Sequence, residues 1–140
     1  MKKHWKLLSE LPSLSKRREI VDLIVEGESE RALNVLCDLF RVSRVKLVVG
    51  EGFLSGHSAY YDGEITIPLP EDSINPYVIL HEFAHHLLRE RDILQSVTEL
   101  FFRGGVENER FAIHFPMMFL EGDWYRVWRD RYEPPKGDRT

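Results

Sequence analysis

His81, Glu82 and His85 form a His-Glu-x-x-His sequence, whose residue types and spacing suit a catalytic metal ion. Residues four apart lie on one face of an α-helix, so both imidazoles can face one cation, while Glu82 lies about 100° further round. Neutral imidazoles are typical zinc ligands, and a water in an open fourth position ionises near neutral pH. Glu82 can take that proton and pass it to a leaving group. The pattern predicts zinc-dependent hydrolysis.

Chance produces this pattern rarely. With six histidines and 15 glutamates in 140 residues, about 0.03 random matches are expected. The motif also falls on a segment, residues 76–91, that is predicted to be helical because Pro76 suits a first turn and Asn75 can cap it. The other faces of this helix carry apolar residues that a core can bury: Val78, Ile79, Phe83, Leu87 and Leu88. A helix with incidental histidines is the weaker interpretation.

The third metal ligand should come from a separate element, and two glutamates downstream are candidates. Glu107 and Glu109 are two apart on a predicted helix, so they point about 200° apart and cannot both face the metal. The pattern alone does not decide between them. His114 is another candidate, although a histidine beside Phe115 is more often packed in a core or supports a ligand from behind.

Two segments together resemble a known family. Residues 81–88, His-Glu-Phe-Ala-His-His-Leu-Leu, and residues 107–112, Glu-Asn-Glu-Arg-Phe-Ala, are similar to the gluzincin metallopeptidases, in particular the small ImmA/IrrE-like branch and the minigluzincins. In that branch, a glutamate four residues before a phenylalanine is the third zinc ligand. The resemblance therefore implies a zinc peptidase in which Glu107, four residues before Phe111, binds Zn²⁺ together with His81 and His85.

The resemblance covers roughly residues 45–116, including residues 56–67, which are similar to the hairpin that precedes the family's zinc helix. Two departures stand out. Asn108 and Glu109 replace the usual Ala-Asn, and Pro116 comes earlier than the family's Leu-Leu-Met-Pro would place it. The first departure bears directly on the choice of Glu107, whereas the second concerns only the chain beyond the site.

A β-hairpin is predicted before the motif helix. Residues 57–61 and 64–68 flank Asp62-Gly63, the pair favoured in a two-residue type I′ turn. If residues 58–61 form the free edge of a sheet above the helix, their backbone can bind an extended peptide by strand addition. Four side chains are candidates for stabilising the oxyanion of the reaction: His57, Tyr60, Tyr61 and Tyr77. His86 is expected to be structural or to support a ligand.

The rest of the chain is predicted to form helices and a strand that support the site. Helices are expected over residues 16–26, capped by Ser13 or Ser15, and over 29–41. A strand is expected over 45–49, a loop from Pro68 to Asn75, and further helical stretches over 93–102, 106–115 and onward past Trp128 to about residue 133. We therefore expect one α+β domain over residues 1–140: N-terminal helices, a small, mostly antiparallel sheet with a hairpin, the zinc-site helix and C-terminal helices. Residues 1–15 and 133–140 are expected to be flexible.

The composition of the chain argues against a nucleic-acid-binding protein and a membrane-spanning protein. The chain is 43% hydrophobic and carries a net charge of −4, so no overall basic field favours nucleic acid. No apolar run reaches the ~18 residues of a membrane span, and the N-terminus lacks the apolar core of a signal peptide. The single cysteine, Cys37, fits a reducing compartment. We expect a cytoplasmic enzyme acting on a peptide or protein.

Two alternatives come from other classes. One is a non-catalytic zinc-binding regulatory module, and the other is a DNA-associated regulator that uses the helix pair of residues 16–44. Glu82 favours catalysis, because a structural zinc site has no use for a carboxylate beside an open position. Family relatives often act on transcriptional repressors, so the resemblance implies a regulatory protein substrate by analogy. The sequence does not indicate an oligomeric state.

Overall fold

The computed structural model describes residues 6–7, 9–50, 57–91 and 104–120, with backbone alone for residues 104–107. These residues form helices and one three-stranded sheet, which confirms the predicted α+β class. The elements in chain order are α2 (Leu14–Val25), α3 (Ser29–Phe40), β1 (Lys46–Val49), β2 (Ala59–Tyr61), β3 (Glu64–Ile67), the 3-10 helix η1 (Pro70–Ile74), α4 (Pro76–Glu90), α6 (Gly104–His114) and α7 (Met117–Leu120).

The N-terminal helices form as expected, each within two residues of its predicted ends. Ser13, rather than Ser15, caps α2: its hydroxyl accepts a hydrogen bond from the Lys16 backbone nitrogen at 3.2 Å. Helix α3 ends at Arg41, which has a left-handed backbone conformation with φ of 56°. The two helices pack together through buried apolar residues: Ile20, Ile24, Leu33, Leu36 and Phe40.

The sheet is mixed, so the expectation of a mostly antiparallel sheet is wrong. Its strand order is β1-β3-β2, with β3 antiparallel to β2 and parallel to β1. Asp62 and Gly63 both have positive φ, 47° and 85°, as a type I′ turn requires, and this turn fixes the antiparallel pair. The chain then brings β3 back between its two neighbours, where it runs in the same direction as β1. Among the described strands, β2 lies at the edge of the sheet.

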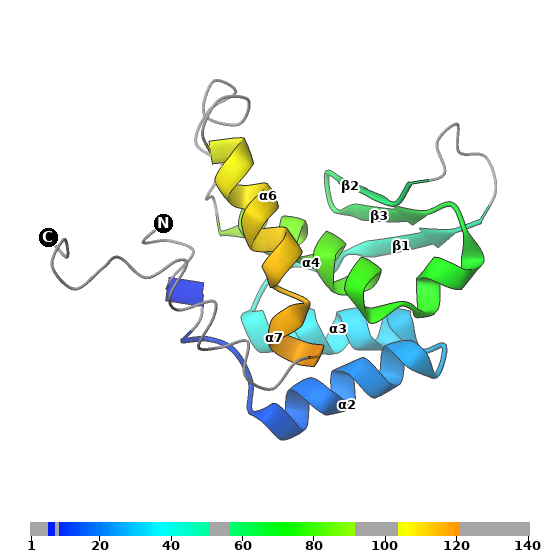
Figure 1. Cartoon of the computed structure of the whole chain (residues 1–140), viewed down its shortest axis with the longest axis horizontal. Helices are drawn as coiled ribbons and strands as arrows, with labels where there is room; N and C mark the ends of the chain where they lie inside the picture. The colour runs from blue at the N-terminus through cyan, green and yellow to red at the C-terminus, as the bar shows by residue number, and fades with distance from the viewer. Residues whose placement is uncertain (1–5, 8, 51–56, 92–103, 121–140) are drawn as a thin grey trace, which may run out of the picture.

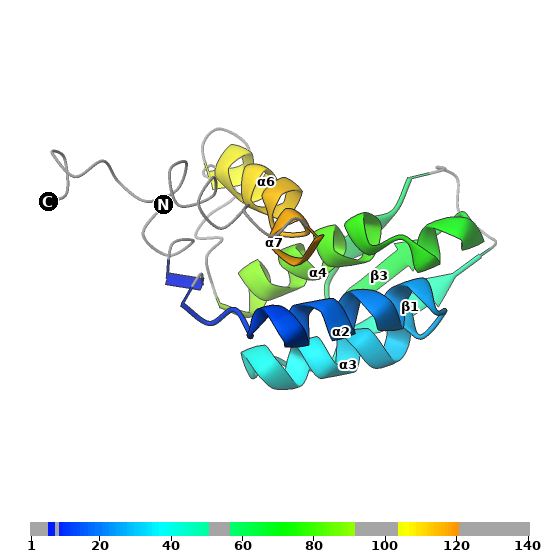
Figure 2. The ribbon, with the colours of Figure 1, turned by 60° about the horizontal axis from the view of Figure 1, so that its bottom comes forward.

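Helix α4 occupies the centre of the described structure. Its N-terminus is capped as predicted, with the Asn75 side chain accepting a hydrogen bond from the Tyr77 backbone nitrogen at 3.0 Å. Figures 1 and 2 show α2 and α3 together on one side of α4 and α6 crossing it on the other. Phe83 of α4 packs against Phe40 and Phe115, with ring centroids 5.9 and 6.2 Å apart. The core therefore fixes the helix that carries the His-Glu-x-x-His motif.

The C-terminal helices follow the sequence pattern in part. Helix α6 covers most of the range expected for residues 106–115, and α7 begins directly after Pro116, as expected of a residue that breaks one helix and allows another to start. The expected loop from Pro68 to Asn75 instead contains η1. The helical stretches expected over 93–102 and past Trp128, and the tail at 133–140, lie outside the described residues.

Part of the N-terminal segment packs on the domain. Leu7 is buried in the core, and the Glu10 carboxylate forms an ion pair with Arg91 just after α4. Arg91 also donates a hydrogen bond to the Phe40 carbonyl at the end of α3. In the described part of the chain, no helix has both the length and the apolar character needed to cross a membrane.

Candidate metal centre

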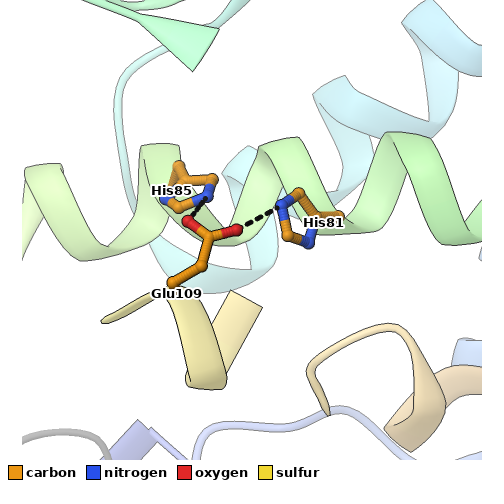
Figure 3. Close-up of side chains that lie close together, drawn as sticks. All are labelled: His81, His85 and Glu109. Atoms are coloured by element: carbon orange, nitrogen blue, oxygen red, sulfur yellow. Dashed lines mark ion pairs between the residues drawn. The ribbon is translucent and has the colours of Figure 1, made fainter. Parts of the chain in front are cut away.

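Three potential metal ligands converge between α4 and α6. His81 and His85 project from one face of α4, and the carboxylate of Glu109 on α6 lies between their rings (Figure 3). The Nε2 atoms of His81 and His85 lie 3.2 and 3.3 Å from Oε1 and Oε2 of Glu109. Donor atoms bound to a tetrahedral zinc ion at about 2.0–2.1 Å lie about 3.3 Å from one another. Two imidazoles and one carboxylate at these distances fit the protein ligands of a catalytic zinc site.

Among the side chains that the structure describes, Glu109 is the glutamate that lies beside the two histidines, whereas the sequence resemblance implied Glu107. Glu107 also lies in α6, but its side chain is outside the described part, so the expectation based on the family resemblance stays a prediction. One orientation of α6 can direct only one of two residues that lie about 200° apart towards α4. The geometry therefore favours Glu109. His114, the other candidate, is buried and does not belong to the described cluster.

One contact of His81 and the burial of His85 bear on how each ring can bind a metal. His81 Nδ1 lies 3.0 Å from the Ala112 carbonyl oxygen, to which it donates, leaving the Nε2 lone pair directed at the cluster. Burial lowers the pKa of His85 below its ordinary value; Glu109 opposes this shift and His81 adds to it. A lowered pKa favours the neutral imidazole, the form that metal binding requires. The Ala112 contact was missed from sequence because any residue type supplies a backbone carbonyl.

Glu82 lies beside the cluster and is almost fully buried. Its Oε2 accepts a hydrogen bond from the Ser58 hydroxyl at 2.7 Å, just before β2. The side chains therefore have different neighbours: His81 and His85 point at Glu109, while Glu82 points at the hairpin. Ser58 was expected only as part of a strand edge, and its contact with Glu82 depends on how the hairpin packs on α4.

An open groove runs along α4 across the cluster. A hollow of about 760 Å³ extends towards the C-terminal end of α4 and is lined by residues 58–62 together with His81, Glu82, His85, Leu88, Arg89, Asn108 and Glu109. A second hollow shares Ser58, His81 and Glu82 and extends towards the N-terminal end, adding His57, Asp72, Tyr77, Val78, Ile113, Pro116 and Met117. The two hollows thus adjoin at Ser58, His81 and Glu82, beside the cluster.

The candidates for an oxyanion donor fall into two groups. The Tyr60 hydroxyl contacts His86 Nδ1 at 2.8 Å and accepts a hydrogen bond from the Gly63 backbone nitrogen at 3.0 Å, so it already has two partners. Tyr60 and Tyr61 both line the first hollow, whereas His57 and Tyr77 line the second. The geometry leaves Tyr61, His57 and Tyr77 as candidates and gives Tyr60 other partners.

The site joins segments that are distant in the sequence: the hairpin at residue 58, the motif on α4 and the middle of α6. Only the α4 part has a strong local sequence signal. Comparison of the chain with models of protein families, with curated proteins and with solved structures found no match.

Proposed function

We propose that this protein is a zinc-dependent metallopeptidase in which His81, His85 and Glu109 bind the ion and Glu82 transfers protons. The observation that carries the proposal is the meeting of two imidazoles and a carboxylate, with a second carboxylate beside them, in an open groove. A bound zinc ion would supply Lewis acidity and lower the pKa of a water molecule. The chain's own residues supply the ligands, the base and the walls of the groove.

Glu82 is suited to act as general base and then as general acid. The Ser58 hydroxyl holds one carboxylate oxygen at 2.7 Å, which limits rotation of the carboxylate and orients it in the groove. A carboxylate fixed in this way can accept a proton from an attacking water and deliver it to the leaving amine. This role needs Glu82 next to the metal ligands but not among them, and its hydrogen bond with Ser58 supports that assignment.

An extended peptide is the substrate that fits the groove. β2 forms the edge of the described sheet, and its outer edge offers backbone groups for pairing with another strand. The two hollows continue along α4 on both sides of the cluster, as an endopeptidase requires. By analogy with the family that the sequence resembles, whose members often act on transcriptional repressors, a regulatory protein is the first substrate class to test. The lone, buried Cys37 suits a reducing compartment such as the cytoplasm.

The two alternatives from other classes have less support. A structural zinc site is closed by four protein ligands, whereas the described cluster contributes three and opens into a groove. For DNA binding, basic residues of α2 must be available for phosphates. The Arg17 guanidinium instead donates hydrogen bonds to the carbonyls of Pro12 and Met118, at 3.0 and 2.7 Å.

The Glu82→Gln variant tests the assignment of the base. The amide cannot take up the water proton, so we expect a loss of about 10²-fold or more in peptidase rate with zinc content and fold retained. Hydrolysis is measured on a mixture of internally quenched peptides, and zinc by elemental analysis. Glu71→Gln, which changes an exposed glutamate of η1, is the matched control and should be as active as wild type. A Glu82→Gln variant with full activity, or one without zinc, contradicts the proposal.

A further inference from the structure

Side chains of the β2 hairpin fasten it to α4 at three successive points. The hairpin residues are two apart, from just before β2 to the turn after it, and their partners are three or four apart on one face of the helix. Two strand residues advance about 6.6 Å and one helical turn about 5.4 Å, so the contacts stay nearly in step. The pairs are Ser58 with Glu82 at 2.7 Å, Tyr60 with His86 at 2.8 Å and Asp62 with Arg89 at 2.6 Å.

The middle contact belongs to a short buried relay. His86 is fully buried, and its Nε2 lies 2.7 Å from the carbonyl oxygen of Ser43, in the segment after α3. Because a carbonyl can only accept, Nε2 carries the hydrogen, and Nδ1 accepts from the Tyr60 hydroxyl. The Tyr60 oxygen in turn accepts from the Gly63 backbone nitrogen at 3.0 Å, within the hairpin turn. One imidazole thus ties the hairpin to the helix and to the core.

The three contacts differ in exposure, and this difference indicates what each can do. Asp62 and Arg89 are largely open to solvent, where an ion pair is weak. Ser58 acts directly on Glu82. In the Tyr60–His86 contact the imidazole is fully buried and the phenol partly buried, so its hydrogen bond is less exposed to water than the Asp62–Arg89 pair, and its loss costs more. Burial also raises the pKa of the Tyr60 phenol, which keeps it protonated and able to donate.

We propose that His86 is a positioning residue for substrate: through Tyr60 it fixes edge strand β2 beside the metal ligands, ready to pair with an extended peptide. The inference rests on the proposed function. A strand that is already ordered spares the substrate the entropic cost of ordering it. His86 therefore acts mainly on substrate binding, and weakening its contact with Tyr60 raises KM more than it lowers kcat.

Two substitutions of His86 separate its two hydrogen bonds. In His86→Asn, the side-chain oxygen can take the place of Nδ1, so the contact with Tyr60 survives and that with Ser43 is lost. In His86→Gln, the amide nitrogen can take the place of Nε2, so the contact with Ser43 survives and that with Tyr60 is lost. Both variants lose the ring, so the effect of lost packing is matched. Tyr60→Phe removes the same contact from the other side, together with the hydrogen bond from the Gly63 backbone nitrogen, so the His86 pair carries the decision.

The first measurement is hydrogen–deuterium exchange of peptides covering residues 57–63, which needs no enzymatic activity. We expect faster exchange in His86→Gln and Tyr60→Phe, with His86→Asn close to wild type and zinc binding unchanged in all three. The second is steady-state kinetics on the best peptide of the quenched mixture, where KM should rise up to about tenfold in His86→Gln and Tyr60→Phe, with kcat within about twofold.

Equal exchange in His86→Asn and His86→Gln overturns the proposal, because packing alone would then explain the effect. Exchange at the wild-type rate in His86→Gln overturns it as well, as does a loss confined to kcat. The two measurements also separate this inference from the proposed function. If the wild-type protein hydrolyses no peptide, the peptidase proposal fails, and hydrogen exchange still decides whether His86 holds β2.

Discussion

The two sides of α4 have opposite compositions although they share one backbone. One side presents Ile79, Phe83 and Leu87, all fully buried among residues of α2, α3 and α6. The other side carries His81 and His85, whose side chains are about one quarter exposed to the groove. Each core residue packs against other apolar residues of the cluster. The positions of the groove residues instead depend on a few specific polar contacts with other elements. Stability and chemistry are therefore carried by different residues of the same helix.

Glu82 and His86 lie between these two sides and combine features of both. Each is buried like a core residue, yet each is polar and has a specific partner on the hairpin. A buried polar group without a partner is costly, so these residues depend on β2 as much as β2 depends on them. The comparison predicts that substitutions at the groove change chemistry with little change in stability, and that core substitutions do the reverse.

The largest effect is expected from His81→Ala, and His85→Ala should behave alike. Removing one imidazole should lower zinc affinity at least 10–100-fold and abolish hydrolysis. The free energy of unfolding of the metal-free protein should change by about 1 kcal/mol or less, because no closed cavity is opened in the core. Zinc titration and urea unfolding without metal measure the two quantities. Unchanged zinc content in both variants would rule out this site.

Phe83→Ala should give the opposite result. Deleting a fully buried aromatic ring that contacts Phe40 and Phe115 should cost about 3–5 kcal/mol in unfolding free energy. The molecules that remain folded should still bind one zinc ion. Phe83→Leu, which removes less volume, serves as the graded control. Zinc affinity is measured under conditions where the variant is folded. A fall in affinity as large as that of His81→Ala would contradict the division of α4 into a core side and a groove side.

Ser58→Ala should have the smallest of these effects. Loss of the hydroxyl leaves Glu82 free to rotate, so kcat should fall by a few-fold to about tenfold while zinc content and thermal stability stay near wild type. Ser15→Ala, at an exposed position on α2, is the control. Loss of zinc in Ser58→Ala would show that the hairpin shapes the metal ligands themselves and not the base.

Sequence reasoning succeeded where the signal was local. Asn75 and Pro76 predicted the start of α4, and Asp62-Gly63 predicted the hairpin turn, because caps and turns depend on a few adjacent residues. The partner of β1 could not be predicted in this way. Its parallel pairing with β3 depends on how segments distant in the chain meet, and a parallel pair has no turn residues that mark it.

The choice between Glu107 and Glu109 also depends on contacts between segments that are distant in the sequence, so local patterns could not make it. Spacing established that only one of them can face α4, but the orientation of α6 depends on its packing. Phe111, Ala112 and Phe115 are among the buried residues here, and Ala112 approaches closely enough for its carbonyl to accept from His81. Glu109 lies one turn before Ala112 on the same side of α6. The small side chain of Ala112 was therefore the sequence feature that could have indicated which side of α6 faces α4.

Zinc titration of Glu109→Ala beside Glu107→Ala tests the central claim most directly, because the two substitutions are chemically identical and lie in one helix. We predict that wild type and Glu107→Ala each bind one zinc ion with similar affinity, and that Glu109→Ala loses at least 10–100-fold in affinity. If Glu107→Ala loses zinc and Glu109→Ala keeps it, the assignment of Glu109 is contradicted. If wild type binds no zinc, the metallopeptidase proposal itself is contradicted.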